Sequence, residues 1–529
     1  AILRDTEPEL HLRSVTLTAK DKICLCETRE CTPEACPYAN GYYARIKGAL
    51  WDVLDVPCLT AETLQEYAER HTVCPFELGL DSSLWSDVII GDYNYLFDPV
   101  VHLVRFFESA GDYIFLVDEA HNLPGRAREM HSAALTKTSF YEAKKLLGKG
   151  KSSLKNALTK VNDVFIEWRH RAEEETAARD GRFGKTFFLK ERSEEFDHLL
   201  NRLCEPLEAW LDDHREPDET HTALLQLYFD VRAWLRVADT FDDHFVLQIT
   251  ASGSEVRAAQ LCLDPSAFLA DSFALGRAAV LFSATLAPAS YYKDLCGVPE
   301  ARAVALRSPF PAGNQGLFCI GNVSTRYKDR DASLAIVAES LATMVRARCG
   351  NYLAFFPSYA YMEQAYAQFK EHCPEINCIK QENAMDEQQK AAFLAQFVPG
   401  PSQPLLGFAV MGGVFGEGVD LTGDRLIGVG IVGPGLPQVG PRQEQLRDYF
   451  EQTRGSGFDY AYRYPGMNKV LQAAGRVIRT PRDKGVVLLI DNRFAMPDYR
   501  RLMPPHWSHL KMIYDTEKLE QELWRFWEE

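Results

Sequence analysis

An aspartate and a glutamate, Asp118 and Glu119, directly follow four apolar residues at 114–117. We expect the apolar residues to form a buried strand, whose carboxyl end is where α/β sheets bind their ligands. A carboxylate at that end can hold the Mg²⁺ of a nucleoside triphosphate, and a second one can orient or deprotonate an attacking water. The plainer alternative is an acidic surface turn that follows a core strand.

Two later strand ends carry short polar motifs. Ser283-Ala284-Thr285 follows an apolar run at 279–282, and its hydroxyls can either bond the acidic pair or cap a helix. The segment Gly416-Glu417-Gly418-Val419-Asp420 follows a strand predicted at 406–411. Its glycines permit close backbone approach to a ligand, and Asp420 can accept from a ribose hydroxyl or an arginine. The alternative here is an ordinary glycine-rich turn.

Gln472, Arg476 and Arg479 are spaced four and three residues apart. On a helix this spacing places all three side chains on one face. Guanidinium groups aimed at a γ-phosphate stabilise the charge that develops during phosphoryl transfer. The alternative is a solvated arginine face.

Six of the 13 cysteines lie between residues 24 and 74. In a long chain without a secretion signal, such clustering indicates metal binding rather than disulfides. Four thiolates can hold one iron–sulfur cluster or one Zn²⁺ ion. The spacing of Cys24, Cys31, Cys36 and Cys74 fits neither a zinc finger nor a zinc ribbon well, although a structural zinc site stays open from the residues alone.

The strands and helices that must position these side chains are those of a large α/β protein. A chain of 529 residues is too long for one core, and no apolar run approaches the ~18 residues of a membrane span. A net charge of −16 argues against a uniformly basic nucleic-acid binder, but not against a protein whose basic residues line a channel. Strand patterns alternate with helical ones, which predicts parallel sheets. Residues 131–240 are charged and helix-periodic, and they read as an insertion.

Together, Asp-Glu-Ala-His at 118–121, Ser-Ala-Thr at 283–285, Gly-Glu-Gly-Val-Asp at 416–420 and Gln-Ala-Ala-Gly-Arg-Val-Ile-Arg at 472–479 resemble the motifs of superfamily 2 helicases. The form Val-Asp-Glu-Ala-His-Asn-Leu at 117–123 resembles the Rad3/XPD and DinG group. The resemblance implies two RecA-like motor domains with parallel sheets. Their expected bounds are 1–21, 75–130 and 241–300 for the first motor, and 301–529 for the second. An iron–sulfur domain at 22–74 and a helical Arch-like domain at 131–240 would be inserted into the first.

The same resemblance implies roles for individual residues. Asp118 would bind Mg²⁺, Glu119 would activate water, and His121, Ser283 and Thr285 would couple hydrolysis to motion. From the second motor, Gln472, Arg476 and Arg479 would clasp ATP, next to Gly416, Glu417, Gly418 and Asp420. A [4Fe–4S] cluster would be held by Cys24, Cys31, Cys36 and Cys74, with Cys26 as a possible substitute for Cys24. Single-stranded or forked DNA would contact Tyr93, Tyr95, Ser358 and Tyr359.

The expected activity is ATP-dependent 5′→3′ DNA unwinding in repair or replication restart, by a cytoplasmic monomer. ATP hydrolysis of this kind requires a phosphate loop with the motif G-x-x-x-x-G-K-[ST], and the 529 residues contain no match to it. Gly184-Lys185-Thr186 does not qualify, because residue 179 is Arg and no strand precedes it. We expect the loop to lie upstream of Ala1, and this chain by itself to bind and hydrolyse ATP poorly. The alternative is a nucleic-acid-binding or scaffold relative without ATP turnover.

Overall fold

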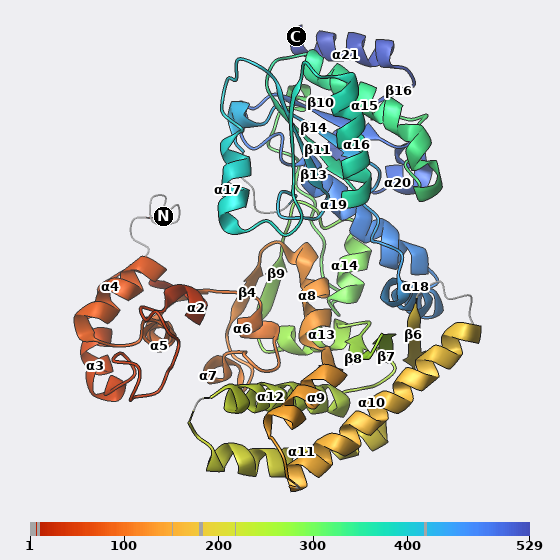
Figure 1. The fold of residues 1–529 in the computed structure, drawn as a ribbon. Helices are drawn as coiled ribbons and strands as arrows, with labels where there is room; N and C mark the ends of the chain where they lie inside the picture. The colour runs from red at the N-terminus through yellow and green to blue at the C-terminus, as the bar shows by residue number, and fades with distance from the viewer. Residues whose placement is uncertain are drawn as a thin grey trace. The chain divides into compact units, whose positions relative to one another are not determined.

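The computed structural model describes residues 7, 11–150, 152–178, 184–216, 218–416 and 421–528. The chain divides into two compact units, Ala1–Ser109 and Ala110–Glu529, and each is described by itself (Figure 1). Both contain parallel strands connected through helices, so the expected α/β class is confirmed. No helix in these ranges is both long and apolar enough to cross a bilayer.

The first unit is built on a small parallel sheet of order β2-β1-β3. Val15 on the central strand and Leu64 on a covering helix are fully enclosed in its core. The helix that carries Leu64 begins where Thr60 Oγ1 accepts the backbone N–H of Thr63, which satisfies one of the donors left over at a helix start. The elements of this unit are β1 (Ser14–Thr16), α2 (Lys20–Ile23), α3 (Tyr42–Val53), β2 (Cys58–Leu59), α4 (Ala61–His71), α5 (Pro75–Ser82), β3 (Val88–Ile90), α6 (Asn94–Phe97) and α7 (Val104–Phe107).

The second unit begins with the strand that precedes the acidic pair, β4 (Ile114–Val117), which pairs in parallel with β9 (Ala278–Leu281). The expectation that β4 is buried is wrong for most of its length. Ile114 is 64% exposed and Leu116 68%, whereas Val117 is buried. Among the described residues β4 pairs only with β9, and a two-stranded sheet buries apolar side chains only where another layer packs against it.

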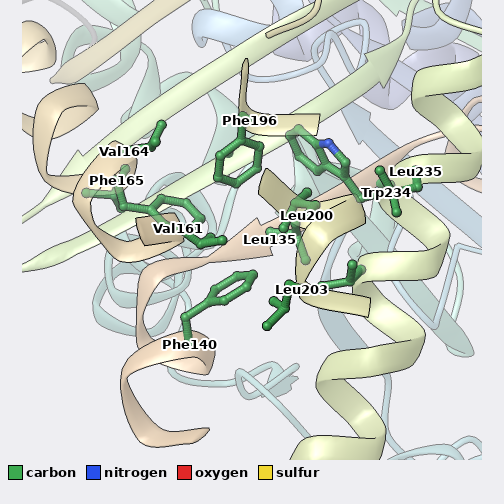
Figure 2. Packing of buried hydrophobic residues seen from close by; sticks show 14 of the residues in the cluster. Leu135, Phe140, Val161, Val164, Phe165, Phe196, Leu200, Leu203, Trp234 and Leu235 are labelled. Atoms are coloured by element: carbon green, nitrogen blue, oxygen red, sulfur yellow. The ribbon is translucent and has the colours of Figure 1, made fainter. Parts of the chain in front are cut away.

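Between β4 and β9 the chain forms a subdomain of helices and an antiparallel sheet of order β5-β8-β7-β6. Its core is dense in aromatic rings, and Phe165, Phe196 and Trp234 meet edge to face within 6 Å (Figure 2). Because β7 and β8 pair with β5 and β6, this sheet extends past the boundary expected at residue 240. The elements are β5 (Ala133–Thr136), α9 (Lys137–Leu146), α10 (Ser153–Ala178), β6 (Lys185–Leu189), α11 (Glu194–Asp213), α12 (Glu219–Asp239), β7 (Phe245–Ser252) and β8 (Glu255–Cys262).

Two segments connect this subdomain to the paired strands, α8 (Leu123–Met130) after β4 and α13 (Ser266–Ala274) before β9. Arg128 joins α8 to the stretch between β8 and α13, because its Nε donates to the carbonyl of Leu263 at 2.8 Å. Nearby, the backbone N–H of Cys262 donates to Ser132 Oγ at 3.0 Å. The guanidinium of Arg128 also lies 5.7 Å from the ring centre of Phe450, on a helix of the following domain.

That following domain has a seven-stranded parallel sheet of order β12-β13-β11-β14-β15-β10-β16. Every residue of β11, β14 and β15 is buried, because separate apolar clusters cover the two faces of the sheet. α14 (Ala289–Leu295) precedes this domain and shares an apolar cluster with β7 and β8. The elements of the domain are β10 (Gln315–Ile320), α15 (Arg330–Arg346), β11 (Asn351–Phe356), α16 (Tyr359–His372), β12 (Asn377–Lys380), α17 (Glu387–Ala395), β13 (Leu405–Val410), β14 (Gly428–Val432), α18 (Pro441–Arg454), α19 (Tyr464–Ala474), β15 (Gly485–Ile490), α20 (Pro497–Arg500), β16 (Lys511–Ile513) and α21 (Thr516–Glu528).

Candidate active site

Asp118 and Glu119 stand at the carboxyl end of β4, and both are exposed. The chain turns sharply there, with Glu119 in the left-handed region at φ 46°. Asp118 Oδ1 accepts the backbone N–H of Glu119 at 2.7 Å, and the N–H of Ala120 donates to the carbonyl of Phe282 at 3.1 Å. A non-glycine residue at positive φ costs energy and is common where a functional side chain must be aimed. The turn thus presents two oxygen ligands of the kind Mg²⁺ prefers.

Glu119 is the first member of a hydrogen-bonded relay that crosses two strand ends. Ser283 Oγ, just after β9, lies 3.0 Å from Glu119 Oε2 and donates to it. His121 Nδ1 lies 2.7 Å from the same Ser283 oxygen and 3.2 Å from Glu119 Oε2. Thr285 bonds Ser283 through its hydroxyl and its backbone N–H, at 3.4 and 3.3 Å. The expected coupling residues are therefore brought together, with His121 buried among them.

The relay continues into the second parallel-sheet domain. The amide of Gln472, on the last turn of α19, bonds His121 Nε2. With Nδ1–H donating to Ser283, Nε2 is the acceptor of that bond. One imidazole therefore connects the Glu119 side of the relay to a helix that lies 351 positions further along the chain.

Arg476 and Arg479 do not share a helix face with Gln472, so that expectation is wrong. α19 ends at Ala474, with Gly475 as its C-cap. Beyond it, Asp483 Oδ2 accepts the backbone N–H groups of Arg479 and Thr480, each at 2.7 Å. A carboxylate that takes these N–H groups holds the chain in a turn rather than a helix.

Arg476 contacts one of the residues expected to bind nucleotide. Arg476 donates through Nε and Nη2 to the carbonyl of Gly416, at 3.2 and 2.9 Å. This contact ties the end of α19 to the glycine-rich segment after β13. The side chain of Arg479 is exposed. The remaining residues expected to contact nucleotide, Glu417, Gly418 and Asp420, lie outside the described residues.

The four expected cluster ligands are not gathered at one point. Within the described ranges, no three side chains of His, Cys, Asp or Glu stand close enough to hold one metal ion. Cys26 and Cys36 are neighbours, with their sulfurs 3.8 Å apart. Burial, followed by the neighbouring thiols of Cys36 and Cys24, raises the pKa of Cys26 to about 11. The geometry thus favours Cys26 over Cys24 as the neighbour of Cys36.

The residues expected to contact DNA lie in both units. In the first, Tyr93 precedes α6 and packs edge to face on Phe97, and Tyr95 on α6 packs against the core of that unit. In the second, Ser358 follows β11 and accepts the N–H of Tyr361 as the N-cap of α16. The hydroxyl of Tyr359 accepts from Gln381 Nε2 at 2.7 Å.

Sequence reasoning missed three residues that shape these sites. Asp483 fixes the turn after α19, and its signal was the Thr-Pro-Arg-Asp stretch at 480–483, which is typical of a turn. Arg330 donates to the Ser358 hydroxyl at 3.4 Å, and exposed Tyr327 lies beside Arg330. No motif marks these two residues.

Comparison with known proteins identifies helicase relatives. A family described as Helicase C-terminal domain matches residues 341–510, and the DEAD_2 family matches residues 9–140. The XPD helicase subunit of general transcription and DNA repair factor IIH from Schizosaccharomyces pombe is 24% identical, over 84% of this chain and 67% of that protein. The ATP-dependent DNA helicase CHL1 of Coccidioides immitis is 22% identical, over 85% of this chain and 60% of that protein.

The fold agrees with these matches. A solved structure named XPD_Helicase superimposes with a TM-score of 0.60 at 18% identity, covering 97% of this chain and 88% of that one. The chain itself spans about two thirds or less of the length of the two curated relatives.

Proposed function

Because the chain belongs to the XPD/Rad3-like family of superfamily 2 helicases, we propose that it is part of a protein that couples ATP hydrolysis to 5′→3′ movement along single-stranded DNA. The process it serves is DNA repair or the restart of replication. The observation that carries this proposal is the relay from Glu119 through Ser283 and His121 to Gln472. Such a relay gives a hydrolytic site a physical connection to a second domain, which a motor requires.

Each residue of the site has a role in this proposal. Asp118 holds the Mg²⁺ of ATP, and Glu119 takes the proton of the attacking water. Arg476 and Arg479 stabilise charge on the transferred phosphoryl group from the opposite side. Support comes from the exposed carboxylates at the strand end and from the contact of Arg476 with Gly416. Glu417, Gly418 and Asp420 would complete the nucleotide contacts.

A [4Fe–4S] cluster in the first unit is the second part of the proposal. Cys24, Cys31, Cys36 and Cys74 would be its ligands, with Cys26 as the substitute that the Cys26–Cys36 contact favours. All of these cysteines carry free thiols, as a thiolate ligand set requires. Because they do not converge on one point, we assign no step of the reaction to the cluster. Its part would be to order residues 22–74.

The third part concerns DNA. Tyr93 and Tyr95 would stack bases, and Ser358 and Tyr359 would contact the DNA backbone. Support comes from the position of Ser358 at the carboxyl end of β11, with the N-terminus of α16 beside it. The N–H groups at such an end attract a phosphate. The partner would be single-stranded or forked DNA, bound by a monomer.

The test is ATP turnover and strand separation by the full-length protein. Turnover should rise when single-stranded DNA is added, and duplexes with a 5′ tail should be unwound in preference to those with a 3′ tail. Unwinding from 3′ tails instead would refute the polarity. DNA binding without ATP turnover would refute the motor and favour a non-motor nucleic-acid-binding or scaffold protein.

A further inference from the structure

Arg330, the first residue of α15, lies beside two tyrosine rings. Its guanidinium carbon lies 4.9 Å from the ring centre of Tyr361 and 5.5 Å from that of Tyr327. Tyr361 is fully buried on α16, and its hydroxyl bonds Ser333 Oγ at 2.6 Å. α15 and α16 lie side by side (Figure 1). The guanidinium plane is therefore fixed before any ligand arrives, which lowers the entropy lost on binding.

The charge of Arg330 has no carboxylate to balance it. Its Nη1 donates to Ser358 Oγ at 3.4 Å, whereas no Asp or Glu in the described part of the chain lies within ion-pair distance. Its Nε is buried and has no hydrogen-bond partner among the described residues. By contrast, nearby Arg493 is paired with Asp491 at 2.7 Å. Burial, together with the charge of Arg493, lowers the pKa of Arg330.

A second unbalanced cation lies in the loop that leads into α15. Arg326 Nη1 bonds Asn492 Oδ1 at 3.3 Å and Ser324 Oγ at 3.4 Å, and the described residues offer it no ion pair. The loop follows β10, and Asn492 follows β15, which pairs with β10. Both arginines thus stand at the carboxyl edge of the parallel sheet, where α/β folds bind ligands. A buried or partly buried cation without a counter-charge is what an anion-binding position requires.

Tyr327 adds an aromatic surface to this cationic position. It is 87% exposed, whereas Tyr361, the other ring beside the guanidinium, is enclosed in the core. A large ring left in solvent next to a fixed guanidinium is poorly explained by packing. Nucleic-acid-binding proteins use this pair of groups to stack a base and to neutralise its phosphate.

We propose that Tyr327 and Arg330, with Ser358, form a subsite for one nucleotide of a single strand, in which Arg330 binds the phosphate and Tyr327 stacks the base. This inference rests on the proposed function, because it names new residues on the nucleic-acid path of the same protein. Arg326 contributes a second positive charge next to the phosphate-binding position. A free phosphate would need only the two arginines, so the tyrosine distinguishes a nucleotide from a simple anion.

The test is binding of a fluorescent dT₂₀ oligonucleotide to the full-length protein, compared with an abasic oligonucleotide of the same length. Tyr327→Ala should weaken binding of dT₂₀ about fivefold or more and leave abasic binding unchanged, while Tyr327→Phe should behave as wild type. Arg330→Gln should weaken both, and should reduce the slope of log affinity against log salt by about 0.7. Lys328→Gln, an exposed charge on the same turn, is the matched control and should have the smaller effect.

The outcomes separate the two proposals. If wild type binds dT₂₀ but Tyr327→Ala and Arg330→Gln bind equally well, the subsite is refuted and the proposed function stands. If wild type binds neither oligonucleotide, both are refuted. Competition by polyglutamate as strong as by dT₂₀ would assign the site to an acidic peptide and overturn the inference. Because Tyr327 is exposed, Tyr327→Ala should unfold at the same temperature as wild type. The Tyr327 variant therefore still tests the subsite if Arg330→Gln lowers stability.

Discussion

Gln472 and His121 are separated by 351 positions in the chain, yet their side chains share a hydrogen bond. The other imidazole nitrogen bonds Ser283, which itself bonds Glu119. A change in the position of α19 must therefore either move the imidazole or break a bond to a buried nitrogen. Breaking such a bond costs about 1–3 kcal/mol, which is enough to shift a two-state equilibrium.

The first prediction concerns that bond. Gln472→Ala should reduce the stimulation of ATP turnover by single-stranded DNA about tenfold, with ATP binding retained, because the relay loses its connection to α19. Turnover with and without DNA measures the effect. His121→Ala should have a similar effect, and the double variant should lose no more than either single one. Additive losses would mean that the two residues act independently.

The second prediction concerns Glu119. Glu119→Gln keeps an oxygen that can accept from Ser283 but removes the proton acceptor, so turnover should fall by about 10²- to 10⁴-fold. Binding of ATP and DNA should persist. Glu129→Gln on α8, an exposed carboxylate in a 3.5 Å ion pair with Arg126, is the matched control. Undiminished turnover by the Glu119 variant would remove this residue from the mechanism.

The third prediction concerns the cysteines of the first unit. Protein purified without oxygen should contain about four irons per chain, and Cys36→Ser should lose them. Cys58→Ser, in which an exposed thiol outside the predicted set is replaced, should keep its iron. Comparing Cys24→Ser with Cys26→Ser decides which of the two is the ligand. Stoichiometric zinc in place of iron would overturn the cluster.

The fourth prediction concerns Asp483, which accepts two backbone N–H groups and the Thr480 hydroxyl. Burial opposes ionisation, but these hydrogen bonds outweigh it and lower the pKa of Asp483 below its ordinary value of 3.8. A lowered pKa adds stability above the unfolded-state pKa, and this stability is lost as the pH falls through the folded-state pKa.

Asp483→Asn should therefore lower the unfolding free energy by about 1–2 kcal/mol at pH 7, and the difference from wild type should shrink below about pH 4. Thermal unfolding at several pH values measures this. Asp424→Asn, at an exposed position of the same domain, serves as the control. A difference that stays constant down to pH 3 would assign the role of Asp483 to packing instead of charge.

The fifth prediction concerns Asp197, a buried carboxylate in the subdomain between β4 and β9. Its Oδ1 accepts from Trp234 Nε1 at 2.8 Å, its Oδ2 has no hydrogen-bond partner among the described residues, and Arg192 lies 4.0 Å away. Burial raises its pKa. A raised carboxyl pKa means that stability falls as the pH rises through the interval between the unfolded-state and folded-state pKa values.

Asp197→Asn removes the buried charge and keeps an acceptor for the indole N–H. It should raise the unfolding free energy at pH 7 by about 1 kcal/mol, whereas Asp197→Ala should lower it by about 1–3 kcal/mol. Thermal unfolding separates the two. Destabilisation by the asparagine variant at pH 7 would show that Arg192 compensates the charge.

Local signals in the sequence were enough to predict the position of the acidic pair, its serine partner and the parallel sheets, because each of these depends on a strand and its carboxyl end. They were not enough for Arg476 and Arg479, because helix spacing says nothing of Asp483, which accepts the backbone N–H groups of Arg479 and Thr480 and holds the chain in a turn. The exposure of Ile114 and Leu116 depends on which layers cover β4, which an apolar run does not encode. Arg330 and Ser358 meet only because α15 and α16 are neighbours in the folded protein.

The bond from Arg128 to the carbonyl of Leu263 has a mechanical consequence. The subdomain between β4 and β9 is attached at both ends to the relay, since one connection leaves just after His121 and the other returns just before Ser283. Arg128 fastens these connections to each other and touches Phe450. Asp264, one residue after Leu263, adds to this attachment, because Tyr449 and Arg454 of α18 lie 3.5 and 3.9 Å from its carboxylate. A displacement of α18 would therefore reach both connections, and through them the two strand ends that carry His121 and Ser283.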